Sequence, residues 1–331
     1  MRASRPVITE SNAARLTPVA RLGPSLPDLF ACGQRLAFDP TGTRLSALAR
    51  RGNPLRWWDL EMLSPEPMWN HASASGMHSL VFPDAEHVLT VVSANRSPLG
   101  LWRPRLVAFC AKDGAQARER HLTHAVTRLA MSADGARLLL VPLEGDSPEV
   151  WDLKSWRPLR ELTPMDLGVS VTACALSPEG RFAAVTFHAD DRRGENLWLW
   201  DVASEARPVT LSIDAPTVWS LAFHPTQPLL AVGGITEEVA VVHVGERRQV
   251  RSLSGFHGYA CNLSFNPDGT LLAASRDGRG FGVHRFDTGE ALFHHGDGED
   301  LHTSDAVFSP DGRLVAWGRA DGTVELWGVA D

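Results

Sequence analysis

One short phrase returns seven times along this chain of 331 residues: an apolar residue, a turn rich in Pro, Asp and Gly, and then an apolar run. It is clearest in FNPDGTLLAAS from Phe265, in LSPEGRFAAV from Leu176 and in FSPDGRLVAW from Phe308. The apolar anchors of the copies are Phe38, Phe82, Met131, Leu176, Phe223, Phe265 and Phe308. Their separations are 44, 49, 45, 47, 42 and 43 residues. A period of this length predicts a repeat fold in which each copy is one structural unit.

Each copy predicts four short strands. A first strand such as 220–223 precedes the turn, where Pro fixes φ and Gly tolerates a positive φ. A second strand such as 270–275 and a short polar turn lead to a third strand that ends on an aromatic residue, often followed by Asp. We place this aromatic position at Trp58, Phe109, Trp151, Trp200, Phe286 and Trp327, with Val242 in the fifth copy. A more polar fourth strand, such as 157–162 or 247–253, completes the pattern typical of a propeller blade.

These repeats resemble WD40 repeats, and the resemblance covers residues 15–331, nearly the whole chain. It implies a seven-bladed β-propeller whose four-stranded sheets pack face to face around a central channel. The copies are degenerate, because the buried network of His, Ser or Thr, Asp and Trp that such blades often carry is incomplete. The sixth copy comes closest, with His257, Ser275 and Asp277. We therefore expect blade packing to depend more on apolar burial than on this network.

The seventh copy ends at Val329, after its third strand, and lacks a fourth. Near the other end of the chain, RLTPVARL (15–22) matches the fourth-strand phrases but belongs to no copy of its own. We predict that this segment completes the last blade and closes the ring, because an open ring would leave an unpaired sheet edge. The expected fold class is all-β: a seven-bladed β-propeller over residues 15–331, preceded by an N-terminal tail, 1–14.

Composition narrows the classes of partner. The formal net charge of −7 repels phosphate backbones, so no nucleic-acid partner is expected. Lys112 and Lys154 are the only lysines, and arginine, which makes up the rest of the basic residues, suits pairing with carboxylates or stacking on aromatic rings. The cysteines show no metal-binding spacing: Cys32, Cys110, Cys174 and Cys261. Neither a signal peptide nor a membrane-spanning stretch is evident, so we expect a cytoplasmic chain with no membrane partner, monomeric by itself.

A search for catalytic chemistry finds no nucleophile elbow, phosphate-binding loop, zinc-protease motif or dinucleotide fingerprint. We therefore predict that the chain is not an enzyme and binds no cofactor. Histidines do gather in the connections between blades, most densely in HHGDGEDLH (294–302). Imidazole and carboxylate groups are ligands for divalent ions, but structural or solvated histidines explain the same stretch, and we predict no metal site.

Two predicted connections between second and third strands exceed the repeat pattern: SANRSPLGLWRP (93–104) and HADDRRGEN (188–196). Both carry arginines and the first carries a tryptophan, residue types that are enriched in interface hot spots. By propeller topology they share a rim with the histidine-bearing connections. The candidate partner-binding residues are Arg96, Trp102, Arg103, Arg192, Arg193, His257 and Tyr259. For Trp219, packing between blades is favoured over lining the mouth of the channel.

Two functions of different classes are consistent with these features. The first is a non-catalytic scaffold, a subunit or adaptor of a multi-protein assembly that binds proteins or peptide segments through a loop-bearing rim. The second is a propeller enzyme or a sensor of a small molecule or metal, which would use the channel mouth and the histidine-rich rim. The absence of a catalytic motif favours the scaffold.

Overall fold

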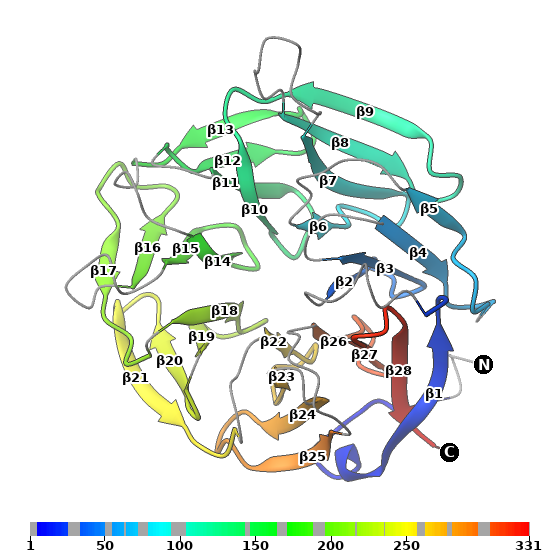
Figure 1. Cartoon of the computed structure of the whole chain (residues 1–331). Helices are drawn as coiled ribbons and strands as arrows, with labels where there is room; N and C mark the ends of the chain where they lie inside the picture. Colours follow the sequence, from blue (N-terminus) through cyan, green and yellow to red (C-terminus); the bar gives the residue numbers. More distant parts are fainter. Residues whose placement is uncertain are drawn as a thin grey trace.

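The computed structural model describes residues 5–25, 34–49, 55–62, 64–71, 79–93, 104–142, 146–163, 171–187, 196–215, 217–234, 236–256, 262–276, 280–296 and 305–330. These residues form seven antiparallel four-stranded sheets, which stand as blades around a central axis (Figure 1). They contain no α-helix, and a single 3-10 turn, η2 (Ala13–Arg15), precedes the first strand. The predicted all-β, seven-bladed propeller is therefore confirmed.

The strands follow chain order from the inside of each blade outward. Blade 1 comprises β2 (Gln34–Phe38), β3 (Arg44–Ala49), β4 (Leu55–Asp59) and β5 (Trp69–His71). Blade 2 comprises β6 (Leu80–Val81), β7 (His87–Ser93), β8 (Pro104–Cys110) and β9 (Gln116–His121). Blade 3 comprises β10 (Val126–Met131), β11 (Arg137–Pro142), β12 (Glu149–Asp152) and β13 (Arg157–Glu161). Blade 4 comprises β14 (Val171–Leu176), β15 (Phe182–Phe187), β16 (Leu197–Asp201) and β17 (Val209–Leu211).

The remaining blades repeat this order, except that the last one borrows a strand. Blade 5 comprises β18 (Val218–Phe223), β19 (Leu229–Gly234), β20 (Val239–His243) and β21 (Arg248–Leu253). Blade 6 comprises β22 (Asn262–Phe265), β23 (Leu271–Arg276), β24 (Gly280–Arg285) and β25 (Ala291–His295). Blade 7 comprises β26 (Ala306–Phe308), β27 (Val315–Gly318), β28 (Val324–Val329) and, as its outer strand, β1 (Leu16–Leu22).

The predicted ring closure is confirmed by the pairing of β1 with β28. The two strands run antiparallel, with Leu16 opposite Val329 and Leu22 opposite Val324, and they lie side by side in Figure 1. Because the outer strand of blade 7 comes from the opposite end of the chain, the backbone groups of β28 are paired on both sides. The edge of blade 7 thereby moves outward from β28 to β1, so that this blade has four strands like the others and joins the two ends of the chain.

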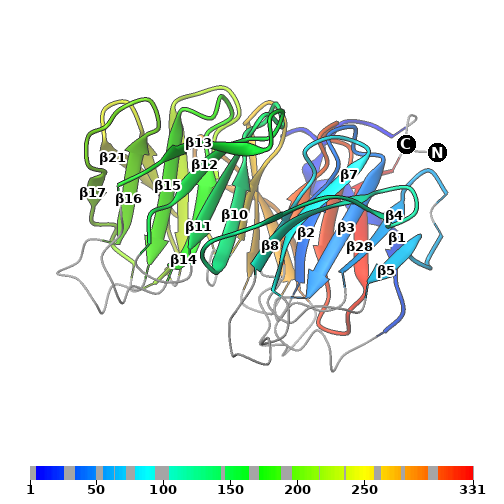
Figure 2. The same cartoon turned by 90° about the horizontal axis from the view of Figure 1, so that it is seen from above.

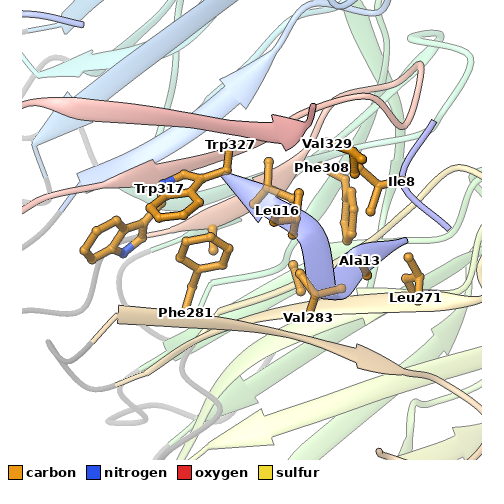
Figure 3. Close-up of a cluster of buried hydrophobic side chains, with 13 residues drawn as sticks. Ile8, Ala13, Leu16, Leu271, Phe281, Val283, Phe308, Trp317, Trp327 and Val329 are labelled. Carbon is orange, nitrogen blue, oxygen red and sulfur yellow. The ribbon is translucent and has the colours of Figure 1, made fainter. Parts of the chain in front are cut away.

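The segment before β1 also packs against the body of the propeller. Ile8 and Ala13 are fully buried in a cluster of side chains from blades 6 and 7, together with Phe308 and Val329 (Figure 3). The backbone N–H of Ile8 donates to the carbonyl oxygen of Gly312 at 2.8 Å. Residues 7–15, here called the N-terminal clasp, thus join the last two blades beyond the strand pairing of β1.

Turn chemistry explains why the repeated phrase has its composition. In the turn after β10, Ser132 Oγ accepts the backbone N–H of Arg137 at 2.9 Å and donates to Asp134 Oδ1 at 2.6 Å. Gly135 has φ +69°, in the left-handed region that favours glycine. The turn after β26 repeats this bonding, since Ser309 Oγ accepts the N–H of Leu314 at 3.0 Å. The Ser, Asp and Gly of the phrase are therefore local determinants of the first hairpin in a blade.

Apolar clusters fill the spaces between neighbouring blades. Among the described residues there are seven such clusters, one at each of the seven blade interfaces. Two third-strand tryptophans donate to different kinds of acceptor: Trp151 Nε1 donates to Glu149 Oε2 at 2.6 Å and Trp200 Nε1 to Thr163 Oγ1 at 3.0 Å. The buried Nε1 of Trp327 finds no acceptor among the described residues. The expectation that packing depends mainly on apolar burial fits this arrangement, although His257 and Asp277 lie outside the described residues.

In blade 6 the structure corrects the aromatic position. Leu272 pairs with His284 as Leu138 pairs with Trp151, so His284 and not Phe286 occupies this position. The sequence pair Phe-Asp was misleading because β24 ends at Arg285 and Phe286 belongs to the following turn. The buried His284 ring stacks on Phe256 with 4.0 Å between ring centroids, and in this way fills the space that an indole fills elsewhere.

Candidate binding site at the mouth of the channel

The antiparallel blades give the molecule two distinct ends. We call the end at which the first strand of each blade begins the mouth rim, and the opposite end the turn rim; Figure 2 shows the strands running between them. The chain turns from first to second strand and from third to fourth strand at the turn rim. It passes from second to third strand, and from one blade to the next, at the mouth rim.

The sequence-predicted partner-binding residues all lie outside the described residues, within 94–103, 188–195 and 257–261. The described chain leaves and rejoins the mouth rim at the ends of these segments. Ser93 ends β7 and Pro104 begins β8, while Phe187 ends β15 and Leu197 begins β16. The prediction that these residues bind partners therefore stays a prediction.

The described part of the mouth rim surrounds a cavity of about 170 Å³ at the channel. Its walls come from the first strands of six blades or the residues that immediately precede them. The lining residues are Arg35, Leu36, Ser79, Leu80, Arg128, Leu129, Ala173, Cys174, Trp219, Ser220, Leu221 and Asp305. Trp219, for which the sequence favoured packing between blades, is half-buried and contributes to this lining.

On one side of this channel-mouth cavity lies Arg35, whose guanidinium group is paired with Asn262 and Asp305. Arg35 Nη1 on β2 donates to Asn262 Oδ1 on β22 at 3.0 Å and lies 3.4 Å from Asp305 Oδ1. The other carboxylate oxygen, Asp305 Oδ2, accepts the backbone N–H of Leu36 at 2.9 Å. Asp305 thus links blades 1 and 7 while it balances the charge of Arg35.

Arg128 on β10 provides a second guanidinium group. Its Nε donates to the carbonyl oxygen of Thr172 at 3.3 Å, and its Nη1 donates to the carbonyl oxygen of Thr127 at 3.0 Å. No carboxylate of the described residues forms an ion pair with it. Burial, and then the nearby charge of Arg35, lower the pKa of Arg128 to about 10, so the guanidinium stays protonated at neutral pH.

Cys174 on β14 is the nucleophilic group at the cavity, but its environment opposes reactivity. Burial raises the pKa of the Cys174 thiol to about 12, despite the opposing effect of Arg128 and Arg35. A thiol with so high a pKa is almost entirely protonated at neutral pH, and the thiolate is the reactive form. Cys174 therefore behaves as a small apolar side chain in the wall.

Taken together, the channel-mouth cavity holds two cations and one carboxylate, on a chain whose formal net charge is −7. Guanidinium groups in a concave, partly desolvated site bind carboxylates or other anions by charge-assisted hydrogen bonds. The arrangement can therefore accept an acidic group from a partner. Sequence reasoning missed Arg35 and Arg128, although each is the only charged residue of a largely apolar inner strand, QRLAF and VTRLAM.

The histidine-rich stretch gives no metal site within the described chain. No group of three or more His, Cys, Asp or Glu side chains there is arranged to hold a metal ion, and residues 297–304 lie outside that search. The His295 ring lies 4.5 Å from the Trp327 ring and 5.3 Å from the Trp317 ring, between centroids. This histidine therefore packs between blades 6 and 7.

Comparison with known proteins agrees with the repeat pattern. The model of the WD domain, G-beta repeat, matches residues 247–279, which span β21, β22 and β23. WD repeat-containing protein SL1-17 of Schistosoma mansoni is 27% identical over 146 residues, or 44% of this chain and 48% of the relative. The chain thus aligns with about half the length of this relative. In the described residues, no helix has the length and apolarity needed to cross a membrane.

Proposed function

The chain is a WD40-repeat protein, and we propose that it is a non-catalytic scaffold that binds other proteins or peptide segments at its mouth rim. WD40 propellers typically act as protein-interaction scaffolds, and this supports the general role. The finer assignment, a subunit or adaptor of a multi-protein assembly docking through this rim, is our proposal.

The observation that carries this proposal is the channel-mouth cavity. Arg128, Arg35 and Trp219 converge there, and arginine and tryptophan are the residue types that most often dominate binding energy. An acidic side chain of a partner would find one guanidinium that no carboxylate of the described residues balances. The candidate residues of segments 94–103, 188–195 and 257–261 would extend the contact, since the described strands flanking them end at the same rim.

The size of the cavity argues against the alternative function. Sites for drug-sized molecules are usually about 300–1,000 Å³. The channel-mouth cavity is smaller, about 170 Å³, and suits a single inserted side chain better than a substrate or cofactor. The Cys174 thiol, whose pKa burial raises to about 12, is protonated at neutral pH and does not support the enzyme alternative.

Affinity capture from the native host tests the proposal with Arg128→Gln and Arg128→Lys beside the wild type. Loss of charge-assisted hydrogen bonds should weaken partner binding about tenfold or more in Arg128→Gln, while Arg128→Lys keeps the charge and should retain part of the binding. Trp102→Ala and Arg192→Ala with Arg193→Ala test the flanking segments. The matched control is Arg157→Gln on the exposed outer strand β13.

The same partners captured in equal amounts by wild type, Arg128→Gln and the segment variants would remove the mouth rim from the proposal. Direct titration with DNA and RNA at several salt concentrations tests the expectation that nucleic acid is not a partner. Light scattering coupled to gel filtration tests whether the chain is monomeric by itself, and imaging in the host tests the cytoplasmic location.

A further inference from the structure

A second cavity lies between blades 2 and 3 at the turn rim, at the opposite end of the strands from the channel mouth. It measures about 390 Å³, within the range of ligand-binding clefts. We call it the interblade pocket. It is lined by Pro83, Asp84, His87, Ala108, Ala117, Arg118, Gly135, Ala136, Leu153, Lys154 and Trp156.

Arg118 in this pocket has counterparts at the same register position in two other blades. Arg118 pairs with Ala108, Arg160 with Val150 and Arg251 with Val241, in each case between the fourth and the third strand. The guanidinium groups of the two counterparts donate hydrogen bonds to the next blade. Arg160 Nη2 donates to the Ser204 carbonyl oxygen at 2.9 Å, and Arg251 donates to the carbonyl oxygens of Asp287 and Phe286 at 3.0 and 3.2 Å.

Arg251 also stacks on an aromatic ring of the next blade, Phe286, at 4.8 Å, whereas among the described residues Arg118 is held by such stacking alone. Its guanidinium carbon lies 4.8 Å from the centroid of the Trp156 ring, a cation–π contact with the next blade. Within the described chain it makes no hydrogen bond and no ion pair. Stacking orients a guanidinium without using its N–H groups, so Arg118 is positioned and its donors remain available for an acceptor from outside.

Trp156, on whose ring the Arg118 guanidinium stacks, has an unfavourable backbone conformation. Its φ of +59° lies in the left-handed region, where the equivalent turn positions of blades 2 and 6 have Gly114 and Gly289, and blade 5 has Arg247. This conformation disfavours a bulky residue by roughly 1–2 kcal/mol. Trp156 nevertheless keeps only 7% of its surface exposed, and its Nε1 finds no acceptor among the described residues. Backbone strain of this kind is retained where surrounding structure or function requires the side chain.

The charges around the interblade pocket favour an anionic occupant. Neither Arg118 nor Lys154 forms an ion pair in the part of the chain that the structure describes, although hydrogen bonds from Ser155, and then the nearby charge of Lys154, lower the pKa of the Asp152 carboxyl group. The one acidic residue in the lining, Asp84, is engaged already, because its carboxylate lies 3.0 Å from His87 Nδ1 and accepts backbone N–H groups of Glu86 and His87. Two cations therefore face a cavity whose remaining wall is largely apolar, from Pro83 to Leu153 and Trp156.

We propose that the interblade pocket docks an acidic peptide segment of a partner protein, whose carboxylate is bound by the stacked guanidinium of Arg118 with support from Lys154. Planar guanidinium and carboxylate groups match in bidentate geometry, which a stacked arginine offers without further ordering. Apolar side chains beside the carboxylate would contact Leu153 and the rest of the apolar wall. This site goes beyond the proposed function, because it lies on the other rim and does not depend on the channel mouth.

The test uses the full chain and a short fluorescein-labelled peptide of alternating glutamate and leucine, measured by fluorescence anisotropy. A peptide with glutamine in place of glutamate is the matched probe. Arg118→Gln should weaken binding of the glutamate peptide about tenfold or more, and Lys154→Gln should weaken it less. Arg160→Gln is the matched control, since Arg160 holds the same register position but donates to Ser204. Thermal melting of each variant checks that the fold is retained.

Three results would overturn this inference. The first is equal affinity of the wild type for the glutamate and glutamine peptides. The second is an equal loss of binding in Arg160→Gln and Arg118→Gln. The third is tighter binding of a single-stranded RNA oligomer than of the glutamate peptide, because the site would then recognise phosphate. Weak peptide binding that Arg118→Gln abolishes and Arg160→Gln preserves supports it.

Discussion

Replacement of Ile8 by alanine should loosen the N-terminal clasp from blades 6 and 7. Ile8 has no exposed surface and belongs to the buried cluster that includes Phe308 and Val329. Its backbone N–H also donates to Gly312, so the residue joins the clasp to a turn of blade 7 both through its side chain and through its backbone. The substitution removes the side-chain part and leaves the hydrogen bond possible.

The expected cost follows from what the change removes. Ile8→Ala deletes three carbon groups from a fully buried position, and each carries about 0.8 kcal/mol of transfer free energy. The cavity left behind adds to this, and substitutions of this type usually cost about 2–5 kcal/mol. Because Ile8 lies near the end of the chain, where the clasp can detach locally, we expect a value near the lower limit, about 2 kcal/mol.

Two measurements distinguish a global from a local effect. Urea denaturation followed by tryptophan fluorescence gives the free energy of unfolding, and the trypsin cleavage rate after Arg15 reports local release of the clasp. The matched control is Val7→Ala, because Val7 is 40% exposed and should change the free energy of unfolding by less than about 0.5 kcal/mol. If both variants unfold like the wild type and Arg15 is cut no faster in Ile8→Ala, then the clasp does not stabilise the propeller.

Three further outcomes are expected. Arg251→Ala should lower the free energy of unfolding, measured by urea denaturation, by about 1–2 kcal/mol, because two hydrogen bonds and a cation–π contact to blade 6 are lost. The control Arg248→Ala, at an exposed position of the same strand, should have little effect. Gly269→Ala should lower the melting temperature clearly more than Gly245→Ala, since Gly269 has φ +79° and an added Cβ would lie 2.2 Å from the ring of the buried His224. Equal melting temperatures of the two variants would contradict this steric argument. Cys174 should resist iodoacetamide at mildly alkaline pH in the folded chain and react after unfolding, because burial raises its thiol pKa to about 12. Rapid labelling of the native chain, read by peptide mass analysis, would refute the raised pKa.

The thiol pKa also has a consequence for stability. The folded-state pKa of Cys174 is raised above that of an unfolded thiol, ordinarily about 8.5. The unfolded chain therefore releases its proton first as pH rises, and the contribution of this group to stability is lost between about 8.5 and 12.

Much of the fold follows from short-range information. The Ser, Asp and Gly of each repeated phrase bond within a few residues, as Ser132, Asp134 and Gly135 do, so the hairpins can be read from local sequence. The period then fixes the number of blades, and the unmatched segment 15–22 predicts the closing strand. The predicted aromatic position of blade 6 was wrong because strand register, and not the local pair Phe286-Asp287, decides which third-strand residue packs toward the preceding blade.

The sequence alone determined the repeat, the strand order and the meeting of the two chain ends, because these depend on local turn chemistry and on a period that survives degeneration. Only the tertiary structure decided what each arginine does. Arg118 and Arg160 stand in similar outer strands, yet Arg118 stacks on Trp156 and makes no hydrogen bond within the described chain, whereas Arg160 donates to the carbonyl oxygen of Ser204. Arg128 and Arg35, far apart in the chain, meet at the channel mouth. Their roles depend on which rings, carboxylates or carbonyl oxygens the surrounding blades present, and no periodicity within the sequence encodes those contacts.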